Sequence, residues 1–318
     1  MKSVVFLGPP KISGIGQVTR KWATLCQSDF VELGYPLDKN YDVGFAFVIP
    51  LDGLITMMSA YEKKCKRMIY YTICETEPVN EAYGKLFELS KTFYTSSEFC
   101  ANVLSTQFPD AQWNVLKLYA FPRVVVPDAS WTLHESLKGR YVFYHIGNII
   151  DNRKNMNMLI DTFARMKDMN VALVLKATCR WKVSLDAPNV HIINEFLSDE
   201  QMETLHDMCH CYVSCSHSEG AGMGAVEAAM RGKPVIIQEY GATKEYVETP
   251  WVIPCTKVQI GTDDFLFKKE HMWGLPDAVV LYEHMVDVYT RDIRSWEHPY
   301  TISEMDKCKT QIQELVKN

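Results

Sequence analysis

The stretch "SHSEGAGMGAVEAAMRGKPVI" (216–236) connects three segments with the patterns of buried structure. The apolar run 211–214 predicts a strand, the small and apolar residues of 224–231 predict a helix, and 234–238 predicts a second strand. A strand that passes through glycines into a helix and then into another strand indicates a βαβ unit of a parallel sheet. Because such sheets bind ligands at the carboxyl ends of their strands, we expect Glu219 to lie at a binding site.

The same alternation extends in both directions along the chain. Earlier strands are predicted at 3–7, 42–49, 67–72 and 92–95, with helices at 17–25, 53–62, 79–90 and 97–106. A second series has strands at 141–146, 171–175 and 191–193 and helices at 155–167 and 199–206. The prolines of "FPRVVVPDAS" (121–130) interrupt the pattern between the two series.

We therefore predict an α/β protein with two tandem Rossmann-like, doubly wound domains that face a cleft. The predicted bounds are 1–125 for the N-terminal domain, 126–138 for a linker and 139–290 for the C-terminal domain. Residues 291–318 are predicted as a C-terminal helix that packs back on the N-terminal domain. Two domains of about 150 residues are also the expectation for a chain of 318 residues.

Composition and charge narrow the class of protein. Apolar residues make up 47% of the chain and charged residues 23%, which is typical of soluble globular proteins. The net charge of -6 does not favour non-specific binding to nucleic acid or to an anionic membrane. No apolar run approaches the roughly 18 residues that span a bilayer, and the first residues lack a signal-peptide pattern. Ten irregularly spaced cysteines are typical of reduced thiols, so we predict a cytoplasmic protein.

The residues after the strand 211–214 suit a ligand with both phosphate and hydroxyl groups. Glycines at Gly220, Gly222 and Gly224 let a backbone approach a ligand closely, and the helix N-terminus that follows favours an anion. The carboxylates of Glu219 and Glu227 can accept hydrogen bonds from hydroxyls. This combination suits a sugar linked through a diphosphate to a nucleoside, although a glycine-rich turn without a ligand is an equally good interpretation of the pattern alone.

The segment "SEGAGMGAVEAAMRGKPVI" (218–236) resembles the E-x7-E signature of retaining glycosyltransferases of the GT-B fold, especially those of family 4. Glu219 and Glu227 fall on the two glutamates of that signature, and its closing glycine, proline and valine also match. The later segment "YGATKEYV" (240–247) is similar to a G-x-x-E-x-V motif of the same family, with Glu245 in place. The resemblance covers most of the C-terminal half and is weaker in the N-terminal half.

The resemblance implies a role for each matching position. Glu219 is expected to contact hydroxyls of the donor sugar, and Glu227 the ribose of the nucleotide. The backbone that holds the distal phosphate and the sugar is expected to be formed by Gly220, Ala221, Gly222, Met223 and Gly224.

A diphosphate also needs positive charge, both for binding and for stabilising the leaving group. The segment "HIGNIIDNRKNMNMLIDTF" (145–163) supplies Arg153 and Lys154 between a strand end and a helix start, where family members carry a phosphate-binding lysine. Asn148 stands where many relatives have an arginine, so Arg153 is the expected substitute. Lys176 is a weaker candidate for the same phosphates. The alternative is a solvated basic pair, although a helix start is an unfavourable place for cations.

Two segments of the N-terminal half complete the predicted site. "GPPKISGIGQVTR" (8–20) resembles the family's glycine loop, so Gly14 and Gly16 are expected to bind the donor. This loop lacks the third glycine of a dinucleotide-binding fingerprint, which counts against NAD. "YYTICETEPVNEAY" (70–83) ends a predicted strand, and Glu75 and Thr76 are predicted to contact the acceptor or the donor. Alternatively, Glu75 and Glu77 could cap the helix predicted near residue 79.

A zinc site within "HDMCHCYVSCSH" (206–217) is the less favoured interpretation of that segment. Period-two alternation places Cys209, Cys211 and Cys215 on one face of a strand and His210 on the other, whereas tetrahedral zinc sites draw on separated pairs of ligands. We therefore expect a buried strand with small cysteine side chains.

The resemblance implies a metal-independent, retaining hexosyl- or pentosyltransferase (EC 2.4) with Glu219, Lys154 and Arg153 as catalytic residues. Its donor would be linked to UDP or GDP, no cofactor is expected, and its acceptor would be a glycan, a lipid-linked sugar or a protein-linked sugar. A hydroxylated DNA base is a minority acceptor, and nucleic acid is otherwise a disfavoured partner. A nucleotide-sugar epimerase and a non-catalytic partner subunit that binds sugar nucleotides are the alternatives. Transient membrane association and the oligomeric state stay open.

Overall fold

The structure is a computed structural model that describes residues 2–10, 12–119, 121, 125–179 and 181–317. The chain forms two compact units and crosses between them several times. Unit 1 comprises Met1–Phe121, Gln259–Trp273 and Ser303–Asn318, and unit 2 comprises Pro122–Val258 and Gly274–Ile302. The predicted bounds did not include the excursion at Gln259–Trp273, and residues 122–124 of the proline-containing segment lie outside the described residues.

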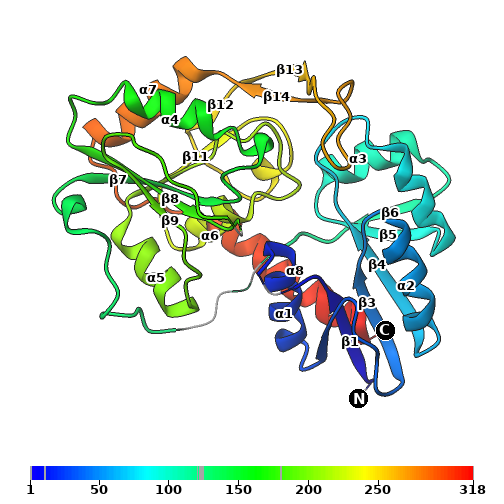
Figure 1. The fold of residues 1–318 in the computed structure, drawn as a ribbon. Coiled ribbons are helices and arrows are strands. Elements are labelled where there is room, and N and C mark those ends of the chain that lie inside the picture. Colours follow the sequence, from blue (N-terminus) through cyan, green and yellow to red (C-terminus); the bar gives the residue numbers. More distant parts are fainter. Residues whose placement is uncertain (1, 11, 120, 122–124, 180, 318) are drawn as a thin grey trace. The chain divides into compact units, whose positions relative to one another are not determined.

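Unit 1 contains a six-stranded parallel sheet with the strand order β2-β1-β3-β4-β5-β6 (Figure 1). Its strands are β1 (Val4–Gly8), β2 (Asp29–Glu32), β3 (Tyr41–Phe47), β4 (Cys65–Thr72), β5 (Thr92–Thr95) and β6 (Gln112–Val115). Its connecting helices are α1 (Gly14–Leu25), α2 (Asp52–Glu62), the 3-10 helix η1 (Glu81–Glu88) and α3 (Glu98–Gln107). Parallel neighbours require such crossover connections, which explains the alternation seen in the sequence.

Burial on both faces makes the central strands of unit 1 apolar. All five residues of β1 are buried, and Trp22 of α1 packs edge-on against Phe45 of β3 and Tyr71 of β4. The indole nitrogen of Trp22 donates to the carbonyl oxygen of Tyr119 at 2.8 Å, so its polar group is satisfied within the core. The part of α8 (Pro299–Lys317) from Ser303 onward belongs to this unit. There, Glu304 of α8 forms an ion pair of 2.7 Å with Lys117.

Unit 2 contains a second six-stranded parallel sheet, with the order β12-β11-β10-β7-β8-β9. Its strands are β7 (Tyr141–Gly147), β8 (Val171–Ala177), β9 (Val190–Ile193), β10 (Cys211–Val213), β11 (Val235–Gln238) and β12 (Val252–Ile253). Its helices are α4 (Met156–Ala164), α5 (Asp199–Met208), α6 (Met223–Met230) and α7 (Ala278–Thr290), with the 3-10 helices η2 (Glu135–Leu137), η3 (Asn152–Lys154) and η4 (Thr243–Glu245). A two-stranded sheet pairs β13 (Cys255–Gln259) with β14 (Met272–Pro276). The prediction of two parallel α/β sheets is confirmed.

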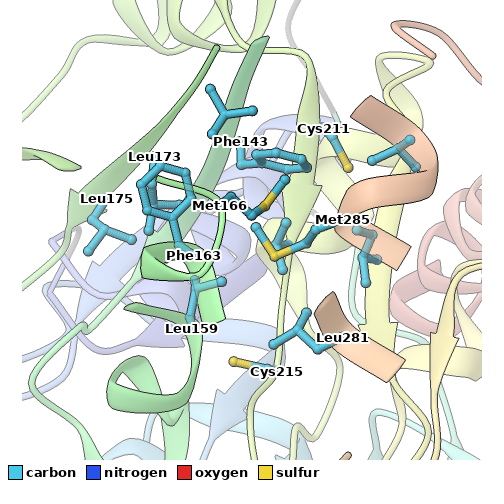
Figure 2. Close-up of a cluster of buried hydrophobic side chains, with 14 of the residues drawn as sticks. Phe143, Leu159, Phe163, Met166, Leu173, Leu175, Cys211, Cys215, Leu281 and Met285 are labelled. Carbon is cyan, nitrogen blue, oxygen red and sulfur yellow. The ribbon is translucent and has the colours of Figure 1, made fainter. Parts of the chain in front are cut away.

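The core of unit 2 lies between one face of its sheet and the helices α4 and α7 (Figure 2). Phe143 and Leu173 point from the strands toward Phe163 of α4 and Leu281 of α7, and all four side chains are buried. Burying each side chain of this kind contributes about 1.5–3 kcal/mol relative to leaving it exposed. This packing holds β7 and β10 in position, and the candidate site described below lies at the carboxyl ends of these two strands.

The cysteines near β10 are packed in the interior, as the sequence predicted. Cys209, Cys211 and Cys215 are fully buried, and burial raises the pKa of each thiol well above its ordinary value. In the part of the chain that the structure describes, no group of three or more His, Cys, Asp or Glu side chains is arranged to hold a metal ion. No helix among the described residues has the length and apolar character needed to cross a membrane.

Candidate functional site

The candidate site lies at the carboxyl ends of two neighbouring strands of unit 2. β7 and β10 are paired in parallel, with Phe143 opposite Cys211 and Tyr144 opposite Tyr212. The chain therefore leaves both strands at the same edge of the sheet. After β7 it passes through 148–151 into η3, and after β10 it passes through 214–222 into α6.

Three charged side chains meet where these two segments come together. Lys154 Nζ lies 2.5 Å from Glu219 Oε1, and Arg153 Nη1 lies 3.0 Å from Glu219 Oε2. The side chains are nearly buried, with exposed fractions of 14% for Lys154, 10% for Arg153 and 8% for Glu219. With the Asp151 carboxylate, which lies 3.4 Å from Arg153 Nη2, two cations and two carboxylates roughly balance in a poorly solvated place. Buried charges persist only when they are paired in this way.

The two cations set the ionisation of Glu219. Burial alone would raise the pKa of this carboxyl group. The charges of Lys154 and Arg153, together with hydrogen bonds from Lys154 and Ser216, outweigh burial and hold the pKa well below its ordinary value. Glu219 is therefore a carboxylate at neutral pH, and it can only accept hydrogen bonds.

The loop after β7 is held in place by local hydrogen bonds. The Asp151 carboxylate accepts from the backbone N–H of Arg153 at 2.9 Å and lies 3.4 Å from its Nη2. Arg153 Nη1 donates to the Ser218 carbonyl at 2.8 Å, and the backbone N–H of His217 donates to the Arg153 carbonyl at 2.7 Å. Asn155 follows in the left-handed region and donates to the Cys215 carbonyl at 3.2 Å. The two loops are thus joined directly, and Arg153 has a fixed direction.

The segment that follows β11 packs against the backbone of Glu219 and holds it in place. The backbone N–H of Ala242 donates to the Glu219 carbonyl at 2.8 Å. Gly241 has a φ of +88°, and a Cβ at this position would lie 2.9 Å from both the nitrogen and the carbonyl oxygen of Glu219. A side chain at residue 241 would therefore displace Glu219, which gives a structural reason for the glycine of the "YGATKEYV" segment.

The glycines of the opening stretch are explained by packing within the protein. Gly222 is the N-cap of α6 with a φ of +78°, and a Cβ there would overlap the side chain of Thr243. A Cβ at Gly224 would overlap the Tyr212 hydroxyl and the carbonyl oxygen of Ile146. Both glycines therefore let α6 approach the sheet closely, which differs from the close ligand approach that we expected of them. A donor-binding role for the backbone of 220–224, including Ala221 and Met223, stays a prediction.

Glu227 and Lys176 lie near this region but outside the three-charge group. Glu227 is on α6, about one turn past its start, and its backbone carbonyl accepts from Arg231 Nη1 at 2.8 Å. Lys176 of β8 lies opposite Ile146 of β7, so it reaches the same edge of the sheet. Its ammonium donates to the Ala177 carbonyl at 2.7 Å, and burial lowers the pKa of this lysine.

His145, which the sequence analysis did not single out, lies beneath the three-charge group. It is 1% exposed, and its Nδ1 lies 2.8 Å from the Val213 carbonyl, so Nδ1 is the donor. Its buried Nε2 has no hydrogen-bond partner among the described residues. Burial and the charge of Lys154 lower the pKa of His145 to about 4, so the ring is neutral. Its position on an otherwise apolar strand was the only signal in the sequence.

Gly147 fits between His145 and Lys154. A Cβ on Gly147 would lie 2.9 Å from His145 Nε2 and 3.6 Å from Lys154 Cε. The tight contact is with His145, whereas 3.6 Å to Lys154 is an ordinary van der Waals distance, so glycine at the last residue of β7 leaves room for the His145 ring.

The four remaining predicted residues belong to unit 1. Gly14 begins α1, and Gly16 lies in its first turn, where a Cβ would overlap the carbonyl oxygens of Pro9 and Pro10. The structure therefore requires glycine at residue 16 for packing, and leaves the space around Gly14 open.

Glu75 and Thr76 follow β4. Thr76 is buried and donates to the Pro78 carbonyl at 3.2 Å, whereas Glu75 is half-buried. The helix expected at 79–90 is the 3-10 helix η1, and its N-cap is Asn80, whose side chain accepts from the backbone N–H of Ala82. The side-chain cap that the structure shows is thus Asn80 and not Glu75.

Comparisons with known proteins agree with this architecture. Residues 134–250 match the family model of glycosyl transferases group 1, and this segment contains Arg153, Lys154 and Glu219. The match covers about a third of the chain and lies entirely within unit 2. A search of curated protein sequences found no match.

Solved glycosyltransferase structures share the fold across most of the chain. A sucrose-phosphate synthase from Thermosynechococcus elongatus is similar with a TM-score of 0.65 at 10% identity, over 99% of this chain and 98% of that chain. A UDP-forming alpha,alpha-trehalose-phosphate synthase from Burkholderia xenovorans gives 0.59 at 12% identity, over 94% and 77%. The pneumococcal O-GlcNAc transferase GtfA, in complex with UDP and GlcNAc, gives 0.57 at 13% identity, over 95% and 59%. At these identities the likeness shows the fold, and the predicted GT-B architecture is confirmed.

Proposed function

We propose that this chain, which carries a group 1 glycosyltransferase segment on a GT-B fold, is a retaining transferase that uses a nucleoside-diphosphate sugar. The observation that carries the proposal is the buried group of Arg153, Lys154 and Glu219 at the carboxyl ends of β7 and β10. Adjacent buried cations at a strand end suit a diphosphate, and a neighbouring carboxylate suits a sugar hydroxyl.

Donor binding would change the partners of the two cations. Without a donor, each oxygen of the Glu219 carboxylate neutralises one cation. A diphosphate carries more negative charge than this carboxylate, so it competes for Arg153 and Lys154. The carboxylate would then be released to accept hydrogen bonds from the hydroxyls of the sugar. Glu219 thereby supplies a counter-charge before binding and a sugar contact after it.

The proposed reaction replaces one bond at the anomeric carbon with another on the same face. The bond from that carbon to the diphosphate oxygen breaks, and its electron pair leaves with the diphosphate. The acceptor hydroxyl oxygen forms the new bond and passes its proton to an oxygen of the departing phosphate. Arg153 and Lys154 stabilise the negative charge that develops on the leaving group, in a metal-independent reaction. The retaining course follows from the family resemblance.

The choice of donor and acceptor substrates rests on analogy with the similar solved structures. Two of the similar structures are named for UDP, as a UDP-forming synthase and as a complex with UDP and GlcNAc. We therefore propose UDP-linked hexoses as the first donors to test, with GDP-linked sugars and pentoses next. The proposed acceptor is a hydroxyl of a glycan, a lipid-linked sugar or a protein-linked sugar.

A donor screen followed by product analysis tests this function. A true donor should raise the melting temperature and should be consumed when a glycan acceptor is present. Lys154→Ala should lose transfer by about 100-fold or more under conditions in which it is folded, and Lys154→Arg should recover part of it. The control Lys244→Ala changes an exposed lysine that pairs with Glu239, and it should transfer normally.

Product structure separates the alternatives. A product that keeps the anomeric configuration of the donor, measured by proton NMR, supports the proposal. Epimerisation of the donor in the absence of an acceptor would identify an epimerase instead. A donor that binds and is never turned over with any acceptor would identify a non-catalytic subunit.

A further inference from the structure

A cavity in unit 2 lies at the opposite end of β7 from the three-charge group. It has a volume of about 190 Å³, and Val142, the second residue of β7, lines it. Gly147 follows Val142 by five positions, and at roughly 3.3 Å per residue the two are about 17 Å apart along the strand. The cavity is therefore a different place from the proposed donor site.

The polar lining of this cavity is basic. The five ionisable side chains that line it are His134, Lys138, Arg140, His210 and Arg294, and no carboxylate is among the lining residues. A site with this composition selects anions.

The charges of these side chains are only weakly neutralised. Lys138 pairs with Glu135, and Arg294 pairs with Asp292, each at 2.7 Å, but both pairs are mostly exposed to solvent. Exposed ion pairs of this kind contribute little and rearrange easily. Arg140 donates to two neutral acceptors, the carbonyl oxygens of Ser136 and Val171.

The hydrogen bonds of His210 give the most specific evidence that this cavity suits an anion. The backbone N–H of Val142 donates to His210 Nδ1 at 2.8 Å, so Nδ1 is unprotonated and the proton of the neutral ring lies on Nε2. Arg294 Nη1 lies 3.0 Å from that Nε2, and a guanidinium has only donors. Two donors therefore face each other across the mouth of the cavity. Burial and the charge of Arg294 lower the pKa of His210 to about 4. The ring is therefore neutral near pH 7, with a single proton for its two nitrogens.

The rest of the lining is apolar. Leu133, Leu137, Val142 and Met208 form the walls next to the basic side chains. The volume of about 190 Å³ exceeds the roughly 150 Å³ of a cavity that holds benzene. The space thus suits a compact apolar group attached to an anion better than a bare anion.

We propose that this cavity binds a small phosphomonoester, with the phosphate between His210 and Arg294 and the apolar part against the four apolar residues. The Arg294 side chain is 55% exposed and can move away from His210, and a phosphate oxygen that then enters between the two donors would accept from both. Lys138 and Arg140 add the positive charge that a dianion needs, and a monoanionic carboxylate would leave more of that charge unbalanced. The proposal does not depend on glycosyl transfer.

Calorimetric titration with phenyl phosphate at low salt tests the proposal. Phenyl phosphate should bind more tightly than inorganic phosphate, and phenol should not bind measurably, because the cavity is expected to recognise both parts together. The Lys138→Ala/Arg294→Ala double variant should bind phenyl phosphate at least about tenfold more weakly. Arg294→Lys, which keeps the charge, should lose less.

Two controls locate the binding. Arg291→Ala removes an exposed arginine that pairs with Asp287 and does not line the cavity, so it should bind as the wild type does. Lys154→Ala should also bind phenyl phosphate normally, because Lys154 lies at the other end of the strand. Loss of binding in Lys154→Ala, unchanged binding in the double variant, or equal affinity for inorganic and phenyl phosphate would each overturn the proposal. Failure of sugar transfer would leave it intact.

Discussion

Replacing Glu219 by glutamine should destabilise the protein and at the same time strengthen its binding of pyrophosphate. Glutamine keeps the shape of the side chain and one acceptor oxygen, but it removes the negative charge that lies between Arg153 and Lys154. The three side chains are at most 14% exposed, so water cannot replace the lost charge. Leaving buried cations without their counter-charge costs about 3–5 kcal/mol in comparable sites.

The expected size of the effect follows from these figures. A loss of about 3 kcal/mol in the free energy of unfolding lowers the melting temperature by roughly 6–12 °C for a unit of this size. Because the carboxylate no longer competes for the cations, pyrophosphate should bind the variant more tightly than it binds the wild type. A tenfold lower Kd adds about 1.4 kcal/mol at saturation, so pyrophosphate should restore roughly 3–6 °C more to the variant.

Scanning calorimetry with and without pyrophosphate measures both effects. Glu239→Gln is the matched control, because Glu239 pairs with Lys244 in an exposed ion pair of 3.1 Å. It should change stability by less than about 0.5 kcal/mol and should not alter the response to pyrophosphate. If Glu219→Gln melts like the wild type, or gains no more from pyrophosphate, then the three charges are not coupled in the way the structure indicates.

Two further predictions concern the same group. The folded-state pKa of Glu219 lies below its unfolded value, so its stabilising effect is complete above about pH 5 and is lost as the pH falls. Urea unfolding should therefore show a steeper loss of stability below about pH 5 for the wild type than for Glu219→Gln, and parallel curves would contradict this. Gly147→Ala should cost about 1–3 kcal/mol, because its Cβ would press on the His145 ring, and the resulting shift next to Lys154 should weaken pyrophosphate binding. Gly53→Ala, with open space around residue 53, is its control in melting and titration experiments, and equal behaviour of the two variants would disprove the packing argument.

The central strands of both sheets could be predicted because they are buried on both faces. β1 and β8 are buried along their whole length, so they stand out as apolar runs. Three edge strands of the described sheets were missed, whereas the edge strand β9 was predicted at 191–193. β2 and β6 are half-buried and mix polar with apolar residues, and β12 has only two residues. An edge strand has one neighbour and one solvated side, so its sequence carries a weaker pattern.

The members of the three-charge group could be named from the sequence, but their contact could not. Lys154 and Glu219 are 65 residues apart, and they meet because β7 pairs with β10, a strand order that local patterns do not reveal. Asp151 and Gly241, which hold Arg153 and Glu219 in place, gave no separate signal. For Gly222 and Gly224 the structure adds a packing role that the sequence did not indicate, and their predicted donor-binding role stays a prediction. Sequence motifs thus indicated which residues matter, whereas the physical reason required the structure.

If the group binds a diphosphate as proposed, the pairing of Glu219 with two cations resolves a conflict that such a buried site faces. Arg153 and Lys154 are neighbours in sequence and lie together on a poorly solvated edge, where two like charges would repel each other and lose their hydration. An internal carboxylate stabilises them in the absence of a donor, but a carboxylate that bound too tightly would block the donor. A carboxylate that divides its two oxygens between two cations satisfies both demands, since each cation is held by one oxygen and stays available to a stronger anion. The partly exposed Asp151 carboxylate already lies 3.4 Å from Arg153 Nη2, so a further acid at this place would make the group net negative and oppose donor binding. We therefore expect an added acid at Asn148, in the loop after β7, to weaken donor binding more than it alters stability.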